Sequence, residues 1–324
     1  MNQVAIEQFP QSHHDAEESI SALRLPGLDG TNPLGFLAAL GLFRILSSDP
    51  QSDRVRMRWV SFGGTWVPEL TGGQLTPQAL MNRLSECLLA EGEHIAIGLF
   101  EDLGAKEPSA RRNAIIERSV SASHKDREAA SWLAAVSSDA VSSEAINQLQ
   151  TVRRDYFIGN IRSVVERTTA SHLERALFHA WDYADPLDNQ SLHLDPTEDR
   201  RHAHQWNKPS GDPSRKSQGG MLGANRLALE AIPIFTSIPD GENLKTIGFT
   251  GRRSSDTRWT WPIWSIPVDF GTMQSLLCRE ELQQIVPSDV DRAKLRAIGV
   301  VSAFRTYRIL VGKTPNFTPP KRIA

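Results

Sequence analysis

The chain has 324 residues, of which 40% are hydrophobic and 23% are charged, a balance typical of globular proteins with one large or two modest domains. Its net charge is −2. Cys87 and Cys278 are its two cysteines, and this number excludes a disulfide framework and a multi-cysteine zinc site. No apolar run approaches the roughly 18 residues of a membrane span, and the polar start lacks a signal-peptide pattern, so we expect a cytoplasmic protein with no membrane partner.

The first strong pattern is a turn followed by a helix that is apolar nearly all round, within residues 25–42. Residues 1–21, which precede it, are polar and are expected to be a flexible leader. Asn32 is placed to cap the helix, and Pro33 suits its first position. Such a helix must be buried. Gly35 and Gly41 each cost about 1 kcal/mol of helix propensity relative to Ala, which indicates that another backbone approaches closely.

The rest of the first half is predicted to be mostly helical. Alternating polar and apolar residues predict a strand over 54–60, and a turn and second strand follow over 62–67. Apolar residues at helical spacing then predict helices over 76–89, 110–120, 126–137, 143–168 and 171–183. The run Asp-Pro-Leu-Asp-Asn at 185–189 breaks this pattern. We therefore expect a mostly helical α+β region over 22–187 and a second α+β region over 188–324.

The second region mixes short helices with strands. A β-hairpin is predicted from strands 245–250 and 258–266, which are joined by a basic loop at 251–256. Residues 207–220 read as a long polar loop, and residues 300–311 as a final strand or helix. Short helices are expected over 195–205, 224–231, 273–285 and 291–299. The fold class predicted is α+β, rich in helix, with a small and mostly antiparallel sheet that includes the basic hairpin.

Basic residues are unevenly distributed. The 36 basic residues comprise 28 Arg and 8 Lys, a bias that suits phosphate recognition and that a GC-rich genome would also produce. No acidic residue follows Asp291, whereas eight cations do: Arg292, Lys294, Arg296, Arg305, Arg308, Lys313, Lys321 and Arg322. This tail predicts an electropositive surface on a nearly neutral protein.

Two further segments carry groups suited to nucleic-acid backbones. In the hairpin, Arg252, Arg253, Ser254 and Arg258 can hold phosphate oxygens. Trp259 and Trp261 share one face of the following strand, where they either stack on bases or fill the core. The second segment is the Gly-rich loop near 208–226. The nucleic-acid contacts expected from this loop and from the tail are Lys208, Arg215, Lys216, Arg226, Arg305, Arg308 and Lys313.

Acidic and imidazole side chains cluster over 193–204, and the cluster has two interpretations. Its members are His193, Asp195, Glu198, Asp199, His202 and His204. The cluster is either a divalent-metal site for phosphodiester cleavage or the capped start of a helix, since Asp195, Pro196 and Glu198 occupy capping positions. No Walker loop and no Gly-x-Ser-x-Gly motif occurs in the sequence.

Several segments resemble CRISPR-associated proteins of the type I-U (I-G) systems, in the manner of a large subunit or an accessory component. They are Leu-Asp-Gly-Thr-Asn-Pro-Leu-Gly-Phe-Leu-Ala-Ala-Leu-Gly at 28–41, Arg-Ala-Leu-Phe-His-Ala-Trp-Asp-Tyr at 175–183, Leu-Asp-Pro-Thr-Glu-Asp-Arg-Arg at 194–201, Gly-Ala-Asn-Arg-Leu-Ala at 223–228 and Thr-Trp-Pro-Ile-Trp at 260–264. The resemblance covers most of residues 23–270.

This resemblance implies a non-catalytic, nucleic-acid-binding subunit of an RNA-guided effector complex in antiviral defence, with no cofactor. In such complexes guide pairing reads the target, while protein contacts the strand backbones. The implied partners are guide RNA, target DNA, other effector subunits and a helicase-nuclease recruited in trans. Two alternatives stay open: a metal-dependent nuclease that uses the 193–204 cluster, and a scaffold that binds only proteins.

Overall fold

The structure is a computed structural model. It describes residues 22–48, 55–73, 75–90, 92–98, 113, 116–121, 123–136, 147–151, 154–186, 190–197, 219–241, 243–251, 256–311 and 314–324. The first half contains β1 (Ala22–Arg24), α1 (Pro33–Ser47), β2 (Arg56–Phe62), β3 (Thr65–Thr71), α2 (Pro77–Leu88), α5 (His124–Val136), α6 (Arg154–Arg167) and α7 (Ala170–Phe178). The second half contains α9 (Leu222–Leu229), η2 (Ile232–Ile234), β4 (Ser237–Asp240), β5 (Asn243–Thr246), β6 (Phe249–Thr250), β7 (Arg258–Trp264), α10 (Phe270–Leu277), α11 (Glu280–Gln283), α12 (Asp289–Ala297), β8 (Val300–Val311), β9 (Thr314–Phe317) and β10 (Lys321–Arg322).

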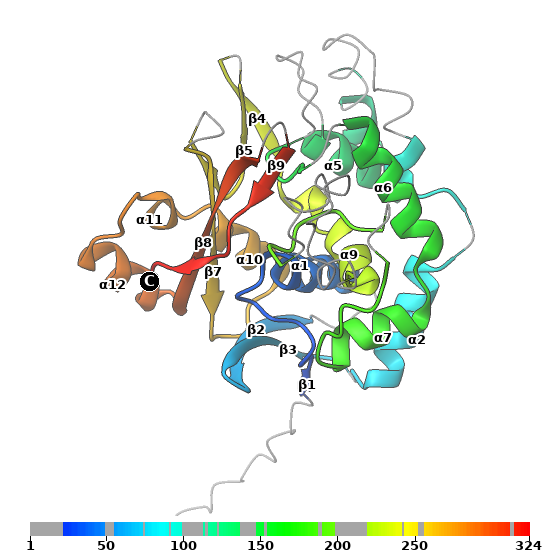
Figure 1. Ribbon diagram of the computed structural model, residues 1–324, viewed down its shortest axis with the longest axis horizontal. Helices are drawn as coiled ribbons and strands as arrows, with labels where there is room; N and C mark the ends of the chain where they lie inside the picture. The colour runs from blue at the N-terminus through cyan, green and yellow to red at the C-terminus, as the bar shows by residue number, and fades with distance from the viewer. Residues whose placement is uncertain are drawn as a thin grey trace, which may run out of the picture.

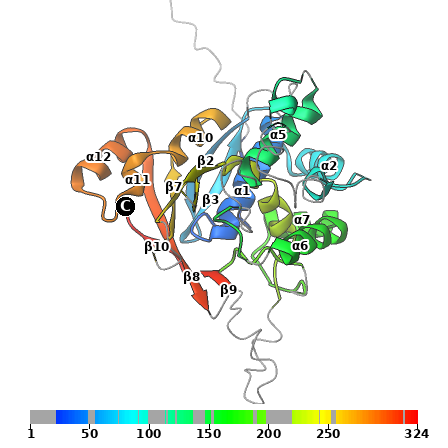
Figure 2. The same ribbon diagram turned by 90° about the horizontal axis from the view of Figure 1, so that it is seen from above.

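Helix α1 lies at the centre of the molecule, with the β7–β8 sheet on one side and α2, α6 and α7 on the other (Figures 1 and 2). Its predicted start is confirmed, because the Asn32 side chain accepts hydrogen bonds from the amides of Leu34 (2.8 Å) and Gly35 (3.4 Å). Every residue from Pro33 to Leu46 is buried. A helix covered on all sides explains the apolar sequence.

The glycines of the central helices allow backbones to touch. A Cβ atom on Gly41 would lie 1.8 Å from the Leu227 carbonyl oxygen, so α9 crosses α1 there at a distance that any side chain would prevent. In the same way Gly223 brings α9 against the His172 carbonyl of α7. Gly35 instead makes room for the backbone of Asp29, in the turn that precedes its own helix. The expectation of close approach is confirmed at both α1 glycines.

The strands form small antiparallel sheets, which confirms the predicted α+β class. One sheet has the order β1-β3-β2, a second has the order β10-β8-β7-β6 with β9 paired to β8, and β4 pairs with β5. Phe36 of α1 joins the first two sheets, since its ring packs against Trp59 of β2 and against Trp259, Trp261 and Trp264 of β7, with centroids 5.6–6.5 Å apart. The indole N–H of Trp264 donates to the Met57 carbonyl (2.8 Å).

Several predicted boundaries are wrong. The strand expected over 245–250 is divided between β5 and β6 by a turn in which Gly248 has φ +79°. The helix expected over 273–285 is divided into α10 and α11, because Arg279 between them has an extended backbone. Of the helix expected over 143–168, residues 147–151 form a turn. The helix expected over 171–183 corresponds to α7, which ends before Tyr183, a residue with φ +51°. Of the helix expected over 195–205, the described residues 195–197 lie in a turn.

One hydrophobic core continues across position 187. It includes α1, β2, α7, α9 and β7 together. The flexible leader expected over residues 1–21 lies outside the described residues. No helix in the described part of the chain is long and apolar enough to cross a membrane.

Candidate nucleic-acid interface

The structure describes four of the eleven residues predicted to contact nucleic acid. They are Arg226, Arg258, Arg305 and Arg308. The other seven lie outside the described residues: Lys208, Arg215, Lys216, Arg252, Arg253, Ser254 and Lys313.

Arg226 is not available to a nucleic acid. Its side chain is 2% exposed and forms an ion pair one helical turn away, with Nη1 2.5 Å from Oε1 of Glu230. A guanidinium that is almost wholly covered by protein and already paired with a carboxylate is not available to a phosphate. The prediction for this residue is wrong, and its role is to neutralise a buried carboxylate.

Arg305 is also an internal residue, with 2% exposure. Its Nε donates to Thr260 Oγ1 (2.8 Å), and its terminal nitrogens donate to the carbonyls of Leu282 (2.9 Å), Gln284 (2.6 Å) and Ile285 (2.6 Å). Burial, followed by repulsion from Arg258, lowers the pKa of this guanidinium below its ordinary value. The side chain fixes the end of α11 on the outer face of β7, so the prediction of a phosphate contact is wrong here too.

Arg258 and Arg308 lie at one end of the large sheet, with their side chains on opposite faces, because Arg258 pairs with Tyr307 and successive residues of a strand point to opposite sides. The Arg308 amide donates to the Thr257 carbonyl (2.9 Å). Both side chains are half-buried: Arg258 Nε donates to Thr250 Oγ1 (2.8 Å) and Arg308 Nη2 to the Gln150 carbonyl (2.9 Å). We call this the basic sheet end: it comprises the end of the β6–β7 hairpin and the C-terminal half of β8.

The tryptophans of β7 belong to the core. Trp259 and Trp261 do share one sheet face, with ring centroids 4.6 Å apart. Both are fully buried: Phe36 packs against both rings, Phe235 and Phe249 pack against Trp259, and Phe304 packs against Trp261. Of the two interpretations, core filling is therefore correct, and base stacking on these rings is excluded.

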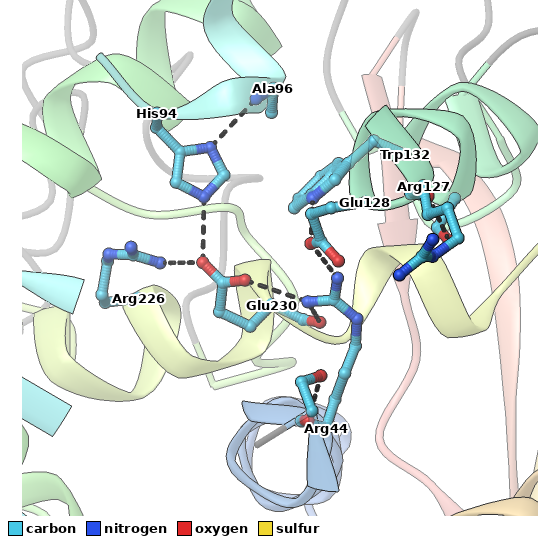
Figure 3. A network of polar contacts seen from close by, with 10 residues as sticks. Arg44, His94, Ala96, Arg127, Glu128, Trp132, Arg226 and Glu230 are labelled. Atoms are coloured by element: carbon cyan, nitrogen blue, oxygen red, sulfur yellow. Dashed lines mark hydrogen bonds and ion pairs between the residues drawn. The ribbon is translucent and has the colours of Figure 1, made fainter. Parts of the chain in front are cut away.

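A buried charge network joins the helices around α1 (Figure 3). Glu230, which follows α9, accepts from Arg44 Nη1 through Oε2 (3.1 Å) and from Arg226 and His94 Nε2 (2.9 Å) through Oε1. Arg44 also pairs with Glu128 of α5. Burial alone would raise the pKa of the Glu230 carboxyl, but Arg226, His94 and Arg44 together outweigh burial and hold this pKa well below its usual range.

The network borders a cavity of about 430 Å³, which Cys87, Leu88 and Val165 also line. His94 is not free to act there as a base, because its Nδ1 accepts from the Ala96 amide (3.2 Å) while its Nε2 faces Glu230. Two arginines face two glutamates, so the charges balance. The arrangement is suited to locking α1, α5 and α9 together. Its sequence signal is Arg44, a lone charge in an apolar helix, which must find a buried partner.

Asp195 is a structural clamp. Its Oδ2 accepts from Asn32 Nδ2 and the Tyr183 hydroxyl (both 3.0 Å), and its Oδ1 accepts from the amide and hydroxyl of Thr197 (both 2.8 Å). These bonds tie residues 195–197 to the start of α1. Of the 193–204 cluster, His193 and Asp195 are described, whereas Glu198, Asp199, His202 and His204 are not. The described part of the chain contains no group of three potential metal ligands.

Comparison with protein-family models, with curated proteins and with solved structures finds no match to this chain.

Proposed function

We propose that the protein is a non-catalytic, nucleic-acid-binding subunit of an RNA-guided effector complex of the type I-U kind, acting in the cytoplasm. The resemblance of residues 23–270 to CRISPR-associated proteins suggests the complex. Guide RNA, target DNA, other effector subunits and a helicase-nuclease recruited in trans are the partners that this proposal entails.

The observation that carries the proposal is the basic sheet end. The β6–β7 hairpin, whose connecting segment includes Arg252 and Arg253 in the sequence, ends beside the half of β8 that carries Arg308. Half-buried Arg258 begins β7, and exposed Lys245 lies in β5, which contacts β6 of the hairpin. Arg258 and Arg308 belong to strands that are distant in the sequence and adjacent in the sheet, so a polyanionic backbone that crosses the end of the sheet can meet both.

The proposal is tested by measuring affinity for single-stranded RNA, single-stranded DNA and duplex DNA over a range of salt concentrations. Each phosphate contact contributes about one unit to the log–log salt slope. Combined Arg252→Ala and Arg253→Ala substitutions are therefore expected to lower the slope by one to two units, to about the same extent for every sequence.

The matched control removes two exposed arginines from α6, by Arg162→Ala and Arg167→Ala. It changes the net charge equally, away from the basic sheet end, and should leave the slope unchanged. A slope that the 252 and 253 substitutions do not alter would exclude the hairpin as a contact. Absence of binding to all three probes at low salt would refute the proposed function and favour the protein-only scaffold.

A further inference from the structure

Helix α12 presents an apolar stripe to solvent. Leu295 is its single buried residue, and it packs the helix onto the rest of the protein. Val290, Ala293 and Ala297 follow the spacing i, i+3, i+7 and therefore share one face, on the side opposite Leu295. All three are exposed, Val290 to 64%. One exposed aliphatic side chain is ordinary on a protein surface, whereas several close together indicate a contact site.

The segment just before the helix is also apolar and exposed, since Ile285 and Val286 are 69% and 75% exposed. We call these two residues and the stripe the α12 patch. The patch is held rigidly. Arg305 binds the Ile285 carbonyl from inside, and the capping box of Ser288 and Asp291 fixes the start of the helix. A surface that is already ordered loses little conformational entropy when it binds.

The charged residues beside the stripe are placed so that those of one copy can pair with those of a second copy. Asp289 in the first turn and Arg296 in the last turn lie on the same flank of the stripe, and both are exposed. Asp289 also pairs with Arg292 of its own helix (3.0 Å), but its side chain is 98% exposed and can accept a second partner. If two copies of α12 pack antiparallel about a two-fold axis, equal flanks face each other. Asp289 of each copy then lies opposite Arg296 of the other. On the other flank, Lys294 is compensated by Glu281 within the same chain (3.8 Å).

We propose that the α12 patch is an isologous interface that binds a second copy of this chain. The antiparallel arrangement gives two intermolecular ion pairs and opposes the two helix dipoles favourably. Ala293 and Ala297 let the helices approach closely. In both views α11 and α12 lie at the periphery, on the opposite side of the molecule from α2, where a second copy can approach (Figures 1 and 2). The inference stands independently of nucleic-acid binding.

The test is the oligomeric state of the full chain, measured by sedimentation from micromolar to hundreds of micromolar concentrations. An interface made of one short helix and the two residues before it is small, so we expect a weak dimer that dissociates on dilution. Val290→Glu should abolish the dimer. Ile238→Glu, which adds the same charge at a 59% exposed residue of β4, should leave it unchanged. Thermal melting of each variant verifies that it is folded.

A charge-reversal experiment identifies the antiparallel geometry. Asp289→Arg alone and Arg296→Asp alone each place like charges opposite one another, so each homodimer should be at least about ten-fold weaker. Mixing the two variants pairs opposite charges at both positions, so a mixed dimer should form with nearly wild-type affinity. A folding defect would not be repaired by mixing.

Three results would overturn the inference: a wild-type chain that is monomeric at every concentration, a Val290→Glu variant that dimerises normally, or a mixture no more associated than its components. If the wild type is monomeric and Val290→Glu loses another effector subunit on copurification, the patch serves that subunit and self-association is refuted.

Discussion

Individual arginines show that burial decides whether a cation makes internal contacts or can bind a ligand. Arg226 and Arg305 are cations that the sequence offers as phosphate contacts, and both are buried in the protein. The partner of Arg226 is readable from the sequence, because Glu230 stands one helical turn away. The partners of Arg305 are backbone carbonyls of residues 282–285, which no spacing rule reveals. A cation satisfied by main-chain oxygens is thus indistinguishable, in sequence alone, from one that binds phosphate.

Replacing the central carboxylate of the charge network should destabilise the protein strongly. Glu230→Gln leaves Arg226 buried without its anion and leaves Arg44 with Glu128 alone, and the loss of one partner of a buried ion pair typically costs about 3–5 kcal/mol. The free energy of unfolding at pH 7, measured by denaturant titration, gives the value. Glu86→Gln is the comparison, because Glu86 forms a solvent-exposed pair with Arg83 (3.9 Å) and should cost less than about 1 kcal/mol.

The same carboxylate predicts how stability depends on pH. Since the pKa of Glu230 is lower in the folded chain than its ordinary value of 4.5, the folded state binds fewer protons there than the unfolded state does. The contribution of Glu230 is therefore complete above about pH 4.5 and is lost as the pH falls toward the folded-state pKa. The stability difference between wild type and Glu230→Gln should narrow below this pH. A constant difference from pH 7 to acid would contradict the assignment.

At the scale of elements, local patterns predict what a segment forms better than where it ends. The cap at Asn32 and the proline after it place the start of α1 correctly. The predicted strands over 54–60 and 258–266 correspond to β2 and β7. The errors arise at short turns: Gly248 and Arg279 interrupt segments whose apolar pattern continues. The spacing of apolar residues continues through such a turn, so it does not reveal one residue whose backbone conformation differs.

The crossing of α1 and α9 predicts opposite effects for two glycine substitutions. Gly41→Ala places a methyl group against the Leu227 carbonyl, and the helices must separate, which should cost about 1–3 kcal/mol or more. Gly159→Ala in α6 meets nothing within 4 Å, so it should instead stabilise the protein by about 0.5–1 kcal/mol. Thermal unfolding of both variants tests the pair. If both substitutions changed the stability equally, helix propensity rather than packing would determine the effect at position 41.

At the scale of the whole molecule, a division at position 187 was predicted from the loop composition of residues 185–189. Buried residues from both sides of this position belong to one core cluster. Asp185 pairs with Gly220 and accepts from the Leu222 amide (2.6 Å), so the start of α9 is bound to the segment that follows α7. Contacts between residues so distant in sequence carry no local signal. They explain why the element types could be predicted and their assembly could not.

The continuous core predicts that the two halves depend on each other for folding. Phe36, from the first half, fills the space among Trp259, Trp261 and Trp264 of the second half, so each half alone exposes a large apolar surface. We expect the full chain to unfold in one transition, with far-UV circular dichroism and tryptophan fluorescence changing together. Phe36→Ala should lower both midpoints equally and cost about 3–5 kcal/mol. If instead Phe36→Ala lowers the fluorescence midpoint but not the circular dichroism midpoint, the halves are separate folding units. In that case the loss of one shared ring affects the tryptophan cluster without affecting α2, α6 and α7.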